Sequence, residues 1–279
     1  MALGMRDTHP EAEAVLIQCA RRMTPGQKFR QVRGLIRFSR AAALSGLRSR
    51  HPHASEDELR LRLGSLVWGA EAMRRAYGWD PGGLAMNTDP IAAAAVVVAA
   101  LDRLGIAYAI GGSIASSVHG LPRTTNDVDI IADVQVRHVD PLVSALSSEY
   151  YIDAGAVTDA IERHSPFNVI HLDTMFKVDV YIVEGDAFRK QEIARRALRD
   201  LDGLVAYVVP PEDIIVAKLR WFPMGGESSE RQWRDVLEVL CVQGPDLDET
   251  YLEATAESLG VADLLAKARE EAARPADPL

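Results

Sequence analysis

The stretch from Ala109 to Val134, AIGGSIASSVHGLPRTTNDVDIIADV, constrains the fold more than any other part of the sequence. An apolar run ends at Gly111-Gly112, and Ser113 then begins a predicted helix. A strand that turns through glycine into a helix presents backbone N–H groups and a hydroxyl at the helix N-terminus, which favours phosphate. A Gly-Gly pair is also typical of a plain turn, so both interpretations stay open for this motif alone.

The same stretch continues through a loop into a predicted strand, DVDIIA. Alternation along this strand sends Asp127 and Asp129 to one face, while Val128 and Ile130 point into the core. Two close carboxylates repel each other and therefore favour a divalent cation between them. Asp-x-Asp pairs also occur at solvent-facing strand edges, where they carry no chemistry.

A third carboxylate favours the cation-binding interpretation of this pair. Asp179 lies in FKVDVYIV, flanked by valines that require burial, so an isolated charge there is costly unless a metal or hydrogen bonds compensate it. Three aspartates on neighbouring strands, beside a phosphate-binding turn, predict a two-metal site for phosphoryl or nucleotidyl transfer.

The remaining pattern predicts an α+β fold with a mixed sheet flanked by helices. Short β-branched runs predict about five strands, in AYAI, DVDIIA, FNVIHL, FKVDVYIV and LVAYVV. Capping-box starts at Thr24 and Ser55 and the apolar periodicity elsewhere predict helices over 9–23, 25–49, 56–77, 91–104, 211–222, 228–242, 248–259 and 261–273.

Composition divides the chain into two predicted domains. The segment YGWDPGGLAMNTDP is typical of a linker, and we place the boundary near Met86. Residues 1–85 then form an all-α basic domain, and residues 86–279 form a second domain whose part from about residue 211 is helical.

The net charge of −9 hides an asymmetry between these two parts. Residues 1–85 carry a balance of +6 and the remaining chain a balance of −15, so the two should attract each other. Arg33, Arg37 and Arg40 share one helical face that could contact an RNA backbone or dock on the acidic part. The lack of interleaved aromatic residues on that face favours docking.

Targeting and redox signals are weak. The N-terminus lacks a basic region followed by an apolar one, and the apolar run Ile91–Leu101 is too short to span a bilayer, so we expect a cytoplasmic protein without membrane contact. Cys19 and Cys241 lie far apart without partners at metal-ligand spacing, which supports neither a zinc site nor a disulfide framework.

Taken together, apolar-Gly-Gly-Ser, Asp-x-Asp and an isolated apolar-Asp-apolar strand resemble the DNA polymerase β-type nucleotidyltransferase superfamily. More narrowly, YAIGGSIASSVHGLPRTTNDVDII with PEDIIVAKLRWF and ERQWRDVLEVL is similar to bacterial AbiEii/AbiGii-type and minimal nucleotidyltransferases. The resemblance covers about residues 88–270 and implies the nucleotidyltransferase fold. Residues 1–85 resemble small helical partners encoded beside such enzymes in a toxin–antitoxin-like arrangement.

The resemblance implies a role for each matched residue. Gly112 and Ser113 would bind nucleotide phosphates, and Asp127 and Asp129 would hold the metal that bridges the triphosphate. Asp179 would help to hold the catalytic metal and activate the attacking hydroxyl. The metal is expected to be Mg²⁺, with Mn²⁺ as a substitute.

The resemblance also implies that Lys218 contacts nucleotide phosphates and that Asp235 is the last motif residue. A solvated helix face is the alternative for Lys218, and a surface ion pair with Arg231 is the alternative for Asp235. Arg123 could contact substrate phosphate or simply fix its loop. His119, followed by Gly120 as a predicted helix cap, is expected to be structural.

The leading hypothesis is a Mg²⁺-dependent nucleotidyltransferase that moves NMP from an NTP to a hydroxyl of tRNA or a partner protein in a toxin–antitoxin-like system. Residues 1–85 would restrain or position its active site. An antibiotic-modifying nucleotidyltransferase and a non-catalytic binding module with the same fold are the alternatives.

Overall fold

The computed structural model describes residues 10–68, 73, 76, 77, 90–125, 127–172, 176–224 and 229–273. The chain forms two compact units: a first unit of residues 1–32, 109–123 and 188–279, and a second unit of residues 33–108 and 124–187. Most of the predicted linker, with the predicted boundary near Met86, lies outside the described residues. The division into domains 1–85 and 86–279 therefore stays a prediction.

The second unit is built around four described strands, β2 (Asp127–Ala132), β3 (Tyr150–Tyr151), β4 (Pro166–His171) and β5 (Lys177–Ile182). β2 pairs with β5 in parallel, β4 pairs with β5 antiparallel, and β3 pairs with β4 antiparallel. The described helices are the larger part of α2 (Pro25–Arg50), α3 (Glu56–Trp68), α5 (Pro90–Arg103), α7 (Val139–Leu146) and α8 (Ala154–Arg163). Among them, α7 packs against both α5 and α8.

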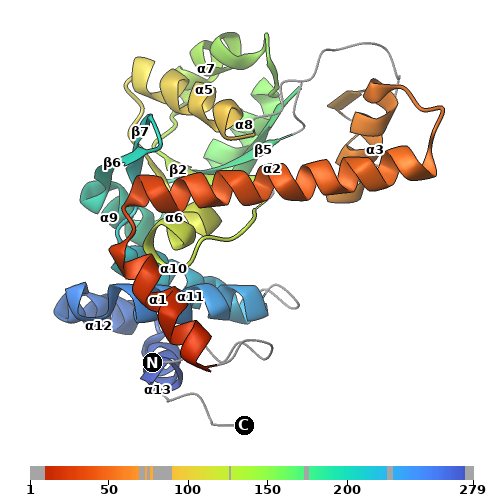
Figure 1. Ribbon diagram of the computed structural model, residues 1–279. Helices are drawn as coiled ribbons and strands as arrows, with labels where there is room; N and C mark the ends of the chain where they lie inside the picture. The colour runs from red at the N-terminus through yellow and green to blue at the C-terminus, as the bar shows by residue number, and fades with distance from the viewer. Residues whose placement is uncertain are drawn as a thin grey trace. The chain divides into compact units, whose positions relative to one another are not determined.

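In the first unit, β1 (Tyr108–Ile110) pairs in parallel with β7 (Leu204–Val208), which pairs antiparallel with β6 (Ala197–Leu201). The order of the seven-stranded mixed sheet is β3-β4-β5-β2-β1-β7-β6. The helices are α1 (Pro10–Arg22), the start of α2, α6 (Gly112–His119), α9 (Ala187–Arg195), α10 (Pro211–Trp221), α11 (Ser229–Gln243), α12 (Glu249–Ser258) and α13 (Ala262–Ala273). Figure 1 labels most of these elements.

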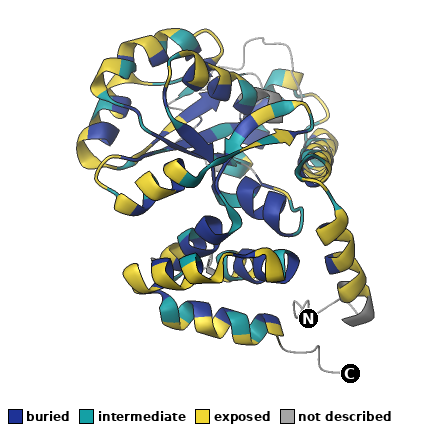
Figure 2. Ribbon diagram, turned by 90° about the vertical axis from the view of Figure 1, so that its left-hand side faces the viewer, coloured by how far each residue is buried: buried dark blue, intermediate teal, exposed yellow. Residues whose placement is uncertain are grey.

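Helix α11 is the packing centre of the first unit, because it contacts α1, α6, α10 and α13. Its buried side includes Val236, Val239 and Leu240, each at most 5% exposed. Figure 2 shows the result: the helices carry buried residues on one side and exposed residues on the other, while strands are mainly buried. No described helix is both long and apolar enough to cross a membrane.

The expected mixed sheet flanked by helices is confirmed. The helices predicted with limits begin and end close to them, except that α3 ends at Trp68, before the predicted end at residue 77, and no limits were predicted for the shorter helices α6 to α9. The number of strands was underestimated, because β3 is only two residues long and the β6 sequence ALRDL has no β-branched residue. The capping box at Thr24 is formed, since Gln27 N donates to Thr24 Oγ1 and Thr24 N donates to Gln27 Oε1. That residues 1–85 form a separate all-α domain stays a prediction.

Gly120 sets how closely α6 approaches α11. It caps α6, as the sequence predicted, and its backbone N–H donates to the carbonyl of Ser116. A Cβ atom on Gly120 would lie 2.9 Å from that carbonyl oxygen and 3.2 Å from both the carbonyl carbon and Cβ of Glu238. Backbone atoms cannot move aside easily, so this position requires glycine.

We predict that Gly120→Ala lowers the free energy of unfolding by about 1–3 kcal/mol, because the added methyl group overpacks the contact between α6 and α11. Gly34→Ala is the matched control. No described atom lies within 4 Å of a Cβ at Gly34, which is within α2, so the change should be neutral or stabilise by up to about 1 kcal/mol. Urea unfolding of both variants tests this, and equal effects would contradict it.

Candidate functional site

The paired strands β2 and β5 bring three aspartates to one face of the second unit. Asp129 is the direct partner of Asp179 in the parallel register, and Asp127 lies two residues before Asp129 on the same strand. The intervening Val128 and Ile130 are 2% and 0% exposed. The alternation predicted for this strand is therefore confirmed.

The side chains around these carboxylates are polar. Lys177, the register partner of Asp127, places its Nζ 2.6 Å from Asp179 Oδ2. The Thr125 hydroxyl donates to Asp127 Oδ1 at 2.8 Å, and the Tyr181 hydroxyl donates to Asp129. Burial raises the pKa of Asp179, and the hydrogen bond and charge of Lys177 oppose that rise.

Sequence reasoning missed Lys177, although a signal was present. Lys177 precedes Asp179 by two residues on a strand, so both side chains must share a face. Lys177 therefore adds a positive charge to the carboxylate face of β2 and β5.

The donor set on this face suits Mg²⁺. Among the described residues, no group of three His, Cys, Asp or Glu side chains lies close enough to hold a metal ion. Carboxylate oxygens are the ligands that Mg²⁺ prefers, and Asp179 Oδ1 is buried without a hydrogen-bond partner. The residues present therefore fit a hard divalent cation, with Lys177 as the competing charge at Asp179.

The glycine turn in the first unit joins β1 to α6 as predicted. Gly112, the first residue of α6, has φ +51°, a left-handed conformation that other residues adopt with strain. Ser113 follows it in the first turn of the helix. Its Oγ accepts a hydrogen bond of 2.8 Å from Arg123 Nη2.

Asp235 pairs with two basic residues of the first unit. Arg123 Nε and Nη2 donate to its two carboxylate oxygens at 2.7 and 2.8 Å, and Lys218 Nζ lies 2.9 Å from Oδ2. Burial alone would raise the pKa of Asp235, but the hydrogen bonds from Arg123 and the charges of Lys218 and Arg123 hold it below its usual value. The structure therefore brings together Ser113, Arg123, Lys218 and Asp235.

Two alternatives raised by the sequence are wrong. Lys218 is 6% exposed, so it does not belong to a solvated helix face. Asp235 is 2% exposed and pairs with Arg123 and Lys218, which excludes a surface ion pair with Arg231 as its main interaction. Periodicity could not reveal this, because Arg123 lies 112 residues away in sequence.

Glu238, one turn after Asp235, is a buried acid that sequence reasoning missed. Burial is the main cause that raises its pKa to about 7, and the negative charge of Asp235 adds to the rise. His119 is structural, as predicted: its Nε2 lies 2.8 Å from the carbonyl oxygen of Val209, and burial lowers its pKa to about 4.

The first residues of the basic N-terminal segment are part of the first unit. Arg21 donates to the carbonyl of Cys241, Lys28 to the carbonyl of His119, and Arg30 to the carboxylate of Asp202. Arg33, Arg37 and Arg40, which were expected to dock on the acidic part, belong to the second unit, and their docking stays a prediction.

Comparisons with known proteins give one family model and several solved structures to which the chain is similar. Residues 21–84 match the family model of the Rv0078B-related antitoxin. No curated protein matches the chain. One similar solved structure is an antigenic nucleotidyltransferase-like protein from Paracoccidioides brasiliensis, with 19% identity, a TM-score of 0.43 and coverage of 65% of this chain and 92% of that one. Another is the antibiotic-resistance factor ANT(2'')-Ia, with 14% identity, a TM-score of 0.41 and coverage of 64% and 97%.

We predict that Asp235→Asn lowers the free energy of unfolding by about 3 kcal/mol, because it leaves Arg123 and the buried Lys218 without their carboxylate. Asp159→Asn, an exposed position on α8, is the control and should change it by less than about 0.5 kcal/mol. The difference is measured by chemical unfolding at neutral pH. A cost for Asp235→Asn no larger than that of the control would contradict a structural role for this cluster.

Glu238 should also make stability depend on pH. The folded chain binds a proton at Glu238 up to about pH 7, whereas an unfolded glutamate releases it near about pH 4.3. The free energy of unfolding therefore falls as pH rises between these values and levels off above them.

We predict that Glu238→Gln, relative to wild type, gains roughly 1–3 kcal/mol between pH 4 and pH 8. Exposed Glu257→Gln on α12 serves as the control, because it removes a carboxylate without altering a buried group. Unfolding midpoints of the three proteins across this range provide the measurement. Parallel curves for wild type and Glu238→Gln would contradict this, because they would show that Glu238 titrates in the folded chain as it does in the unfolded chain.

Proposed function

We propose that this chain is a nucleotidyltransferase that transfers NMP from an NTP to a hydroxyl group and releases pyrophosphate. The observation that carries the proposal is the register of β2 and β5, which sets Asp129 beside Asp179 and Asp127 on the same face. A buried carboxylate oxygen without a partner is costly in a purely structural role. If the site binds a cation, this oxygen can act as one of its ligands.

Asp127, Asp129 and Asp179 would hold Mg²⁺ or Mn²⁺. The bound ion would neutralise the triphosphate and lower the pKa of the attacking hydroxyl. Thr125 and Tyr181 donate hydrogen bonds to Asp127 and Asp129 and so fix the orientation of two of the three carboxylates.

The cluster of the first unit would bind nucleotide phosphates through Gly112, Ser113, Arg123 and Lys218. The glycine allows a close backbone approach, and the serine lies in the first turn of α6, where the helix dipole favours an anion. Asp235 repels phosphate and already accepts from both Arg123 and Lys218. We therefore assign it the task of orienting these two cations rather than of contacting the nucleotide.

The match of residues 21–84 to an antitoxin family model supports a toxin–antitoxin-like role. As part of the proposal, tRNA or a partner protein is the acceptor. In this proposal the antitoxin-like segment restrains or positions the enzyme from within the same chain. Its first part contributes Phe29 and Val32 to the core of the first unit, where they are 2% and 0% exposed. Deleting the segment would expose that core, so the tests use the full chain.

We predict that Asp127→Asn, Asp129→Asn and Asp179→Asn each reduce transfer of labelled NMP at least about 100-fold, because each removes a negatively charged metal ligand. The full chain is incubated with each labelled NTP, Mg²⁺, and either total tRNA or cell lysate. Asp159→Asn on α8 is the exposed control and should keep wild-type activity. The proposal fails if no acceptor is labelled and no NTP binds with Mg²⁺, or if the three variants match the control.

A further inference from the structure

A polar cavity lies in the first unit at the C-terminal end of α6. It has a volume of about 490 Å³ and is lined by residues of α1, α2, α6, β6, α10 and the end of α11. The predicted phosphate turn is at the other end of α6, and an eight-residue helix is about 12 Å long. The cavity is therefore separate from the cluster of Ser113 and Asp235.

Lys28 is the unusual residue of this cavity. It is 3% exposed, and its Nζ donates to the carbonyl oxygen of His119 at 3.2 Å. In the part of the chain that the structure describes, no carboxylate lies within ion-pair distance of Lys28, and two of its three N–H donors have no acceptor. Burial lowers its pKa to about 8, as expected for an ammonium that lacks a counter-ion.

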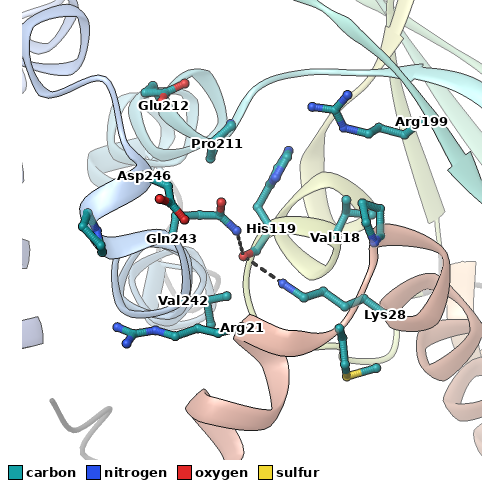
Figure 3. Close-up of a pocket in the computed structure, with 13 residues that line it drawn as sticks. Arg21, Lys28, Val118, His119, Arg199, Pro211, Glu212, Val242, Gln243 and Asp246 are labelled. Carbon is teal, nitrogen blue, oxygen red and sulfur yellow. Dashed lines mark hydrogen bonds between the residues drawn. The ribbon is translucent and has the colours of Figure 1, made fainter.

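The carbonyl oxygen of His119 cannot satisfy Lys28 by itself. Gln243 Nε2 also donates to this oxygen, at 2.6 Å. Figure 3 shows both donors converging on it from opposite sides. A carbonyl oxygen has two lone pairs, so this acceptor is already saturated.

Other groups of the cavity add positive potential. Arg199 and Arg21 line it together with Lys28. Burial is the main cause that lowers the pKa of His119, and the backbone hydrogen bond to Val209 opposes it. The positive charges of Lys28 and Arg199 lower this pKa further, so both charges act on the same ring. Figure 3 shows the guanidinium of Arg199 directed toward that ring.

The acidic residues of the cavity do not balance these charges. Glu212 uses its two carboxylate oxygens on Arg195 and on the backbone N–H of Asp248. Asp246 is exposed to solvent. The cavity therefore holds an excess of positive charge, with Lys28 buried in its wall.

We propose that this cavity binds the phosphate group of a small ligand, with Lys28 and Arg199 as the charged contacts. A phosphate dianion matches two cations and accepts the N–H donors that Lys28 leaves unused. The apolar wall formed by Val118, Val242 and Pro211 suits the uncharged body of such a ligand. The site does not depend on the proposed transferase activity.

The experiment uses the full chain carrying Asp127→Asn and Asp129→Asn, with EDTA present, so that metal-dependent nucleotide binding does not contribute. Inorganic phosphate and AMP are titrated separately by calorimetry at pH 7. We expect at least one of them to bind, with binding weakened at least tenfold by Lys28→Met and by Arg199→Met. Tighter binding of AMP than of phosphate identifies an organic phosphate as the ligand, and equal binding identifies the free anion.

Arg30→Met is the matched control, because Arg30 lies on the same helix as Lys28 but pairs with Asp202 outside this cavity. It should leave binding unchanged. If Lys28→Met fails to fold, Lys28→Arg, which keeps the charge, and Arg199→Met decide the question. The proposal is overturned if neither probe binds, or if Arg199→Met and Arg30→Met weaken binding equally.

Discussion

The parallel register of β2 with β5 is the constraint on which the carboxylate face depends. Four apolar side chains fix it: Val128, Ile130, Val178 and Val180 are all at most 2% exposed. Because side chains alternate along a strand, a slip of one residue would drive Asp179 and Lys177 into the core and expose the valines. The free energy gained by burying the valines therefore also determines which charged groups meet at the other face. Lys177 then becomes part of the arrangement, since the register that sets Asp129 beside Asp179 also sets Lys177 beside Asp127.

In the first unit, a single buried carboxylate has a comparable role. Asp235 accepts from Arg123, which arrives from the loop after α6, and from Lys218 on α10. Such a buried network adds little net stability, because desolvation offsets much of the Coulomb attraction. Its effect is on geometry: it holds the two cations and, through Arg123, the hydroxyl of Ser113 in one arrangement. Glu238 lies one turn along α11, and burial together with the Asp235 charge keeps it protonated over much of the acidic range.

Local patterns in the sequence predicted much of the fold and part of the candidate site. Alternation placed Asp127 and Asp129 on one face, and caps and periodicity located most of the longer helices to within a few residues, although α9 was not predicted. The pairing of Asp235 with Arg123 could not be predicted, because it depends on packing between segments more than a hundred residues apart, for which periodicity has no signal. Strand β6 was missed because ALRDL lacks β-branched residues and is held by its pairing with β7. The compact units are built from separate stretches of the chain, an arrangement that composition along the sequence does not record.

The N-terminal segment shows why net charge was an incomplete guide to docking. A balance of +6 against −15 suggested pairing between basic and acidic side chains, yet Arg21 and Lys28 donate to the backbone carbonyls of Cys241 and His119, near the C-terminal ends of α11 and α6. Helix C-terminal carbonyls carry a partial negative charge and lack intrahelical partners, so they accept from cations without any carboxylate. Phe29 and Val32 bury apolar surface beside these contacts. Residues 21–32 of the antitoxin-like segment thus belong to the fold of the first unit, and any control they exert on activity must act through that folded unit rather than by release of a separable arm.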